Sequence, residues 1–197
     1  MRQLLAKYVC VRVTELNGID IGLFDFDGMN TIYFFVLNAD ERIYLRYGGG
    51  ENSAKNASRP LDEFLSTPSF ELALQLGLEQ HMLYQQGTLP QQPRPAAKFP
   101  RDVRSIKVNY LDKGKCFHCH FPRHYGWGDL DALGKFAKKD VWVFPKLTKI
   151  GLHVDVDKGV VLERATGAAS QAGMIPGDKI VSINDHPVLT YGDLHYR

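Results

Sequence analysis

The sequence predicts a mixed α+β protein. Two short runs rich in β-branched and aromatic residues, 31–37 and 42–47, flank a short turn, which is the pattern of a β-hairpin. Apolar residues then recur at helical spacing over 69–84. A stretch with four prolines and no apolar period, 85–100, separates these elements from a second half of short strands and turns.

Composition narrows the class of protein further. With 44% apolar and 23% charged residues the chain is globular, which excludes a largely disordered protein. A formal charge of +2 offers no basic surface, so we expect no nucleic-acid partner. The longest apolar run, 31–37, is far shorter than the ~20 residues that cross a bilayer, so we expect no membrane span. A length of 197 residues allows one full domain or two small ones.

The elements of the first half follow from local patterns. Residues 2–8 are expected to end a helix, and 9–14 (VCVRVT) to form a strand in which Cys10 is a buried, small apolar side chain. The predicted hairpin, 31–37 and 42–47, follows this strand in the sequence. The helix over 69–84 follows Pro68, a residue typical of a helix N-terminus.

The second half begins with a predicted strand or extended segment over 103–110. Residues 129–139 predict a short amphipathic helix with Leu130, Leu133 and Phe136 facing inward. From residue 150 onward, two short strands, a Pro-Gly-Asp turn, a strand over 179–184 and the start of a helix are expected.

Cys116, Cys119 and His120 form a C-x-x-C-H match. Two thiols three residues apart on one helical turn can each form a thioether with a vinyl group of haem, and the adjacent histidine can ligate the iron. The polar turn 112–114 would let the chain enter a helix here. The motif therefore predicts haem c, held by Cys116 and Cys119 with His120 as the proximal iron ligand.

Other chemistries use the same residue types and stay open. Two Cys and two His suffice for tetrahedral zinc. The candidate zinc ligands are Cys116, His118, Cys119, His120 and His124. The two cysteines could also act as a dithiol redox pair, or carry no ligand.

The sixth ligand of a haem iron is left open by the sequence. His124 lies one turn after His120 on the same side of a continuous helix, so it cannot reach the opposite face of the haem. The distal candidates are His81, Met82 and His153. A five-coordinate haem, or one capped by a neighbouring chain, is an equal alternative. This ligand decides whether the iron transfers electrons or binds a small molecule.

The end of the chain resembles a PDZ domain of the bacterial protease-associated type. The resemblance lies in an apolar Gly-containing segment at 150–154 and in an Ala-Gly turn followed by Pro-Gly-Asp and a strand over 172–184. It implies a groove in which the C-terminus of a peptide adds as a strand. The groove residues would be Ile150, Gly151, Leu152 and His153. The chain stops soon after the start of the helix opposite that groove, so the expected groove is truncated.

The first half resembles the later part of a thioredoxin fold. Residues 9–14 stand where that fold has its second strand, 31–37 and 42–48 where it has its central hairpin, and 69–84 where it has its last helix. The chain has no residues for the C-x-x-C helix of that fold, so no dithiol oxidoreductase activity is expected from this part. As a whole the chain resembles a family of bacterial thioredoxin-like/PDZ proteins, some of which are selenoproteins.

We therefore expect four parts. They are a thioredoxin-like domain over 1–86 without its N-terminal strand, a Pro-rich linker over 87–102, a C-x-x-C-H helical segment over 103–145, and a truncated PDZ-like domain over 146–197. Both ends would then be those of a fragment. Missing strands leave sheet edges open, which predicts a homodimer or an exchanged arrangement that covers them.

The expected function is that of a haem c protein in electron transfer, or in redox or gas sensing, with a redox partner protein. The alternative is a non-enzymatic interaction or scaffold protein with a structural zinc ion. No hydrolase motif stands out, so we do not expect an enzyme. Attachment of haem c generally occurs outside the cytoplasm, which predicts a periplasmic location. The start of the chain lacks the apolar core of a secretory signal, so a cytoplasmic location stays open.

Overall fold

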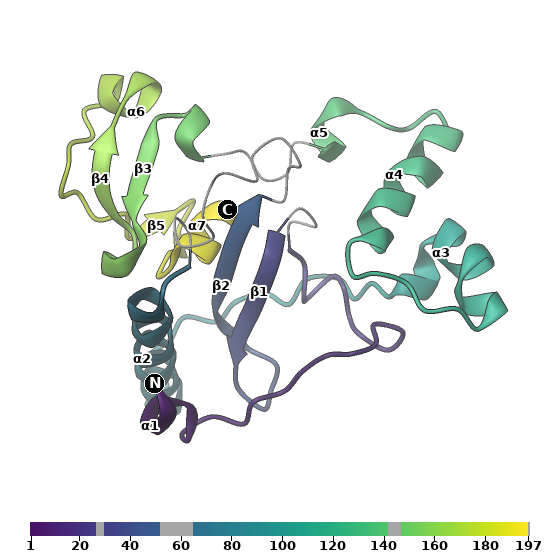
Figure 1. Cartoon of the computed structure of the whole chain (residues 1–197), viewed down its shortest axis with the longest axis horizontal. Helices are drawn as coiled ribbons and strands as arrows, with labels where there is room; N and C mark the ends of the chain where they lie inside the picture. The colour runs from purple at the N-terminus through teal and green to yellow at the C-terminus, as the bar shows by residue number, and fades with distance from the viewer. Residues whose placement is uncertain (27–29, 52–64, 142–146, 197) are drawn as a thin grey trace. The chain divides into compact units, whose positions relative to one another are not determined.

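A computed structural model describes residues 1–26, 30–51, 65–141 and 147–196 (Figure 1). Helices occur together with small antiparallel sheets, so the predicted mixed α+β class is confirmed. The chain forms two compact units: unit 1 comprises 1–10, 29–90 and 144–197, and unit 2 comprises 11–28 and 91–143. The first and last of the four expected parts thus contribute to the same unit.

The predicted hairpin is present in unit 1 as β1 (Asn30–Leu37) and β2 (Ile43–Glu51), which pair antiparallel. Its turn is closed by the side chain of Asn38. The Oδ1 atom of Asn38 accepts the N–H groups of Asp40 and Arg42 at 3.0 and 2.9 Å. An Asn side chain that binds backbone two residues on is a common way to fix a turn.

Helix α2 (Thr67–Gln85) packs against one face of this hairpin, as the helical spacing predicts. A capping box begins it, because the hydroxyls of Ser66 and Ser69 each accept the backbone N–H of the other, both at 3.0 Å. Gly77 allows close approach to the hairpin, since a Cβ there would lie 2.6 Å from the Val36 side chain. The shared core is formed by Val36, Leu45, Tyr47 and Ala73. A short helix, α1 (Arg2–Leu5), stands where the end of a helix was expected.

Replacing Ser66 with alanine is expected to destabilise unit 1 by about 1 kcal/mol, the usual effect of losing an N-cap side chain. Urea unfolding followed by circular dichroism measures the change. Ser182→Ala, at an exposed position of the same unit, serves as the control and should leave the midpoint unchanged. Equal midpoints for both variants would mean that the capping box contributes nothing.

The last part of unit 1 consists of short elements around a core of their own. In chain order they are η4 (Leu147–Lys149), β3 (Leu152–Asp155), η5 (Val156–Lys158), β4 (Val161–Ala165), α6 (Gly167–Gln171), β5 (Ser182–Ile183), β6 (His186–Pro187) and α7 (Tyr191–Tyr196). β3 pairs with β4, and β5 pairs with β6. The two strands expected after residue 150 are present, whereas the strand expected over 179–184 is reduced to Ser182–Ile183.

Helix α7 and the loop before it cover the edge of β2 that faces away from β1. The Oδ1 atom of Asp193 accepts the N–H of Arg46 at 2.8 Å, and the hydroxyl of Thr190 donates to the Arg46 carbonyl. Gly192 permits this approach, because a Cβ there would lie 2.5 Å from the same carbonyl oxygen. The side chains of Asp193 and Thr190 thus bind the N–H and C=O of Arg46, which a neighbouring strand would otherwise bind. The outer edge of β2 is therefore closed within the chain, and the homodimer stays a prediction for light scattering.

The carboxyl of Asp193 is buried, and this changes its titration. Desolvation raises its pKa to about 6, although the backbone N–H groups of Arg46, Leu189 and Thr190 favour the charged form. Its Oδ2 atom accepts the N–H groups of Leu189 and Thr190 at 3.3 and 3.2 Å. The Arg46 guanidinium lies 3.8 Å from the ring centroid of Tyr196, a cation–π contact.

Unit 2 is helical in its described parts. Its elements are η2 (Pro100–Asp102), α3 (Arg104–Asn109), η3 (Leu111–Lys113), α4 (Phe121–Ala132) and α5 (Lys138–Val141), of which the helices are labelled in Figure 1. A side chain of α4 binds the first turn of α3, because the Oδ2 atom of Asp129 accepts the N–H of Ser105 at 3.1 Å. None of the helices in the described ranges is long and apolar enough to cross a membrane.

The strand predicted over 103–110 is wrong, because most of this segment forms α3. Its pattern also fits a helix: Val103 and Ile106, three residues apart, are almost fully buried, whereas Val108 is 49% exposed. A short apolar segment without strict alternation is compatible with either a strand or a helix. Here the helix forms, and it buries Ile106 completely.

The helix predicted over 129–139 is also wrong in position. α4 ends at Ala132, and Leu133 and Phe136, expected to face inward, are 64% and 40% exposed. Gly134 takes a φ of 64°, and the N–H groups of Gly134 and Lys135 bind the carbonyls of Asp131 and Leu130. Gly134 therefore ends the helix, although apolar residues at helical spacing continue beyond it in the sequence.

The strand predicted over 9–14 does not form. These residues adopt no regular structure, and no described strand pairs with them. Val9 is 92% exposed, and Cys10, expected to be buried, is exposed as well. Alternating apolar residues favour a strand only when a partner completes its hydrogen bonds.

Candidate functional site

The segment that carries the cysteines leads into helix α4. It follows η3 and Gly114, whose φ of 60° ends that turn. Residues 115–118 have no regular structure, and α4 begins at Phe121 with His120 as its N-cap. The two cysteines therefore precede the helix, whereas the sequence predicted that they share one helical turn. Pro122 stands in the first turn of α4, where its missing N–H costs no hydrogen bond.

Both thiols of the motif are free and exposed to solvent. His120 is partly buried. In the described ranges, no group of three or more His, Cys, Asp or Glu side chains is arranged to hold a metal ion. The structure thus places the five candidate zinc ligands in one short segment without gathering them into such a group.

Three histidine rings lie close together at the start of α4. The ring centroid of His120 lies 5.7 Å from that of His118 and 5.0 Å from that of His124. Burial lowers the pKa of His120 below its ordinary value, and the two neighbouring histidines lower it further. His120 is therefore mostly neutral at pH 7, the form in which an imidazole ligates a metal.

A cavity of about 640 Å³ lies beside these residues, entirely within unit 2. Its walls come from α4, from the loop 21–26 and from 98–103, and both Cys119 and His120 line it. The apolar part of the wall includes Phe24, Phe26 and Trp127. Its volume falls within the range of about 300–1,000 Å³ that is usual for cofactor and ligand sites.

Most charged groups of this cavity already have partners. Arg123 forms an ion pair with Asp25. The other three carboxylates accept backbone N–H groups: Asp102 from Phe99 at 2.7 Å, Asp129 from Ser105 at 3.1 Å and Asp140 from Ala137 at 2.7 Å. These charged side chains thus bind other residues of unit 2 and form part of the cavity wall.

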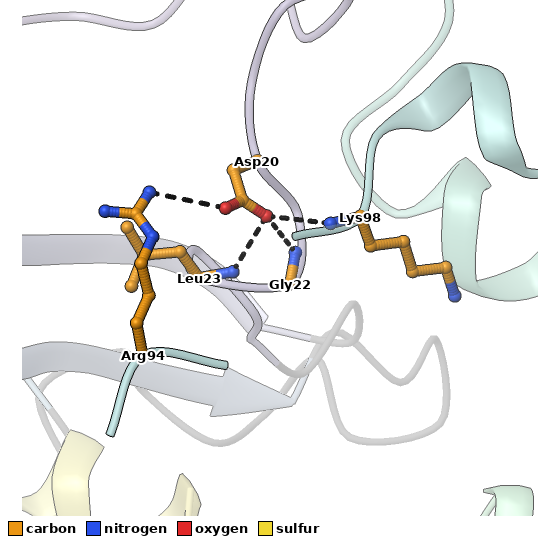
Figure 2. Close-up of polar contacts among 5 residues, drawn as sticks. All are labelled: Asp20, Gly22, Leu23, Arg94 and Lys98. Atoms are coloured by element: carbon orange, nitrogen blue, oxygen red, sulfur yellow. Dashed lines mark hydrogen bonds and ion pairs between the residues drawn. The ribbon is translucent and has the colours of Figure 1, made fainter. Parts of the chain in front are cut away.

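One wall is fixed by Asp20, a residue that is only 8% exposed (Figure 2). Its Oδ1 atom accepts the N–H groups of Gly22, Leu23 and Lys98, at 3.0, 3.2 and 3.0 Å. Its Oδ2 atom lies 3.4 Å from a guanidinium nitrogen of Arg94. Desolvation raises the pKa of Asp20, but these hydrogen bonds outweigh it and leave the pKa below its ordinary value. Asp20 thereby ties the proline-rich segment to the loop 21–26.

The proposed distal ligands belong to unit 1, whereas the C-x-x-C-H motif belongs to unit 2. The Nδ1 atom of His81 lies 2.8 Å from the hydroxyl of Tyr44, and Met82 is 52% exposed. The Nδ1 atom of His153 lies 3.1 Å from a guanidinium nitrogen of Arg164. His81 and His153 thus each have a neighbouring polar group, and a distal role for the three side chains stays a prediction.

The expected peptide-groove residues lie at the start of β3. Gly151 has a φ of 88°, and a Cβ there would lie 1.7 Å from the Thr166 carbonyl oxygen, so only glycine fits. Ile150 is 43% exposed, whereas Leu152 is buried in the core. The cavity of unit 2 is lined by none of the four groove residues.

Sequence reasoning missed the residues that shape the cavity. Asp20, Asp25, Lys98 and Arg123 belong to no recognised sequence motif. Only the Gly/Asp-rich composition of 17–27 marked this loop as unusual. Because Lys98 lies far from Asp20 in the sequence, no local pattern could have joined them. Comparison of this chain with protein families, with curated proteins and with solved structures found no match.

Proposed function

We propose that this chain is a haem c protein, with Cys116 and Cys119 as the thioether cysteines and His120 as the proximal iron ligand. The observation that carries the proposal is that Cys119 and His120 of the C-x-x-C-H motif both line a cavity of cofactor size. When bound, the haem would supply one-electron redox chemistry. The function would be electron transfer with a redox partner protein, or redox or gas sensing.

The chemistry of the attachment residues supports this proposal. Both thiols are exposed and not consumed by a disulfide, so they are accessible for thioether formation. The N-cap position of His120 gives its imidazole a defined place at the start of α4. Partial burial and the adjacent histidines keep this imidazole neutral. Phe24, Phe26 and Trp127 would restrict the access of water to the site, and burial of this kind tunes the potential of an iron centre.

The finer architecture also belongs to the proposal. The hairpin followed by α2 supports a thioredoxin-like part in unit 1, and the order β3, β4, Pro-Gly-Asp turn and α7 supports a PDZ-like part. Together they favour the bacterial thioredoxin-like/PDZ family as the origin of the chain. A periplasmic or other extracytoplasmic location follows from haem c attachment, and we propose a scaffold role without enzymatic activity for unit 1.

The experiment is expression in a host with cytochrome c maturation, followed by acid-acetone extraction. The parent and Cys10→Ser, a change at the third cysteine, are expected to retain the chromophore in the protein fraction. The double variant Cys116→Ser/Cys119→Ser is expected to retain none. A parent that is colourless under conditions in which a known haem c protein matures would overturn the proposal.

The same samples test the zinc alternative. A structural zinc predicts about one zinc per chain in the colourless parent, measured by elemental analysis. The double cysteine variant should then lose both the metal and stability, because ligation by thiolates contributes directly to folding. Covalent haem in the parent would exclude this alternative.

A further inference from the structure

The ionisable side chains that line the cavity of unit 2 divide into two groups. Four carboxylates and Arg123 are engaged in the contacts described above. Among the ionisable lining residues that the structure describes, Lys98, Cys119 and His120 have side chains with no hydrogen bond or ion pair. Two of these three already have a role in haem attachment, which leaves the amine of Lys98.

The backbone of Lys98 is held in place while its side chain is not. Its N–H donates to Asp20 at 3.0 Å, and its carbonyl accepts the N–H of Ile21 at 2.7 Å. Figure 2 shows the side chain extending away from the Asp20 carboxylate. A fixed backbone with a long, unengaged side chain lets the Nζ atom sample the cavity from a defined origin.

We propose that Nζ of Lys98 is the sixth ligand of the iron that His120 holds, an inference that rests on the proposed haem. A neutral amine is a nitrogen donor with one lone pair, so ligation releases the ammonium proton to solvent and moves no electron. Lys98 shares a cavity with His120, whereas His81, Met82 and His153 belong to the other compact unit. Lys98 is thus a distal ligand that comes from the same compact unit as His120.

This ligand gives the site a specific property. A lysine on an exposed, flexible stem competes with external ligands for the iron instead of excluding them. The apparent affinity for an external ligand is then lowered by the fraction of iron that the lysine occupies. If the lysine occupies nine-tenths of the iron, removing it strengthens external binding about tenfold.

The experiment compares the ferric haem-loaded parent with Lys98→Ala, Lys98→Arg and the control Lys113→Ala, an exposed lysine of unit 2 that does not line the cavity. Absorption and electron paramagnetic resonance spectra report the spin state, and titration with imidazole reports the affinity. The parent and Lys113→Ala are expected to be low-spin. Both Lys98 variants should be high-spin and bind imidazole about tenfold more tightly. Lys98→Arg keeps the positive charge, so it separates ligation from an electrostatic effect.

Two results would overturn the inference alone: a covalent haem that is already high-spin in the parent, or unchanged spectra in both Lys98 variants. A change in Lys98→Ala that Lys98→Arg does not reproduce would assign the effect to charge and also reject ligation. A parent that attaches no haem would instead overturn the proposed function, and this inference with it.

Discussion

Unit 1 is expected to lose about 2–3 kcal/mol of stability through Asp193 as the pH rises from 4 to 8. The folded-state pKa of Asp193 is raised to about 6, above the value of about 3.9 in an unfolded chain. The folded state therefore binds the proton more tightly, so the contribution is complete below the unfolded pKa. It disappears as the pH rises through about 6. The difference between these two pKa values corresponds to about 3 kcal/mol, at about 1.4 kcal/mol for each tenfold change in proton affinity.

The measurement is the difference in unfolding free energy between the parent and Asp193→Asn across this pH range. Other carboxylates, such as Asp155, have lowered pKa values and give the opposite slope, so only the difference isolates Asp193. Hydrogen exchange of the β2 amides restricts the readout to unit 1. Asp185→Asn, at an exposed position of the same unit, is the control. Parallel stability curves for the parent and Asp193→Asn would contradict the prediction.

Replacing Asp20 with alanine is expected to destabilise unit 2 by about 3 kcal/mol. Three backbone N–H groups and Arg94 lose their acceptor at once, and a buried donor without a partner costs about 1–3 kcal/mol. Trp127 fluorescence in a Trp142→Phe background reports the unfolding of this unit. Asp112→Ala is the matched control, because its exposed ion pair with Lys107 should contribute less than 1 kcal/mol.

The pH dependence of Asp20 has the opposite sign to that of Asp193. Its folded-state pKa is lowered, so its contribution is present above the unfolded pKa of about 3.9 and is lost as the pH falls through the folded value. Acid should therefore weaken the Asp20 contribution to unit 2, while it strengthens the Asp193 contribution to unit 1. An Asp20→Ala variant as stable as Asp112→Ala would show that water replaces the carboxylate without cost.

Local patterns in the sequence predicted the elements whose partners lie nearby. The strands around Asn38 adjoin each other in the chain, and α2 carries its own capping box and apolar face. Residues 9–14 have equally good strand composition, yet no described strand pairs with them. Ile106 and Leu133 show the same limit. Ile106 is buried because α3 packs against α4, and Leu133 is exposed because Gly134 ends α4 just after it. The spacing of apolar residues predicts neither outcome.

The candidate site was predictable only as a motif. Cys116, Cys119 and His120 lie within five residues of the sequence, so their C-x-x-C-H spacing was recognisable without the structure. The cavity beside them is assembled from the loop 21–26, from Lys98 and from α4, which are separated by dozens of residues. Asp20 binds the loop 21–26 to Lys98, and the ion pair between Arg123 and Asp25 binds α4 to the same loop. No periodicity in the sequence encodes these contacts.

The closure of β2 by α7 sets an order for synthesis on the ribosome. Arg46 obtains its partners from Thr190 and Asp193, and the second of these is translated 147 residues later. All residues of unit 2 precede Thr190 and Asp193 in the chain, so unit 2 can fold while part of unit 1 has not yet been synthesised. Domains commonly fold as units during translation, and here the part that begins first would finish last. Until then the backbone N–H and C=O of Arg46 at the edge of β2 would lack these partners.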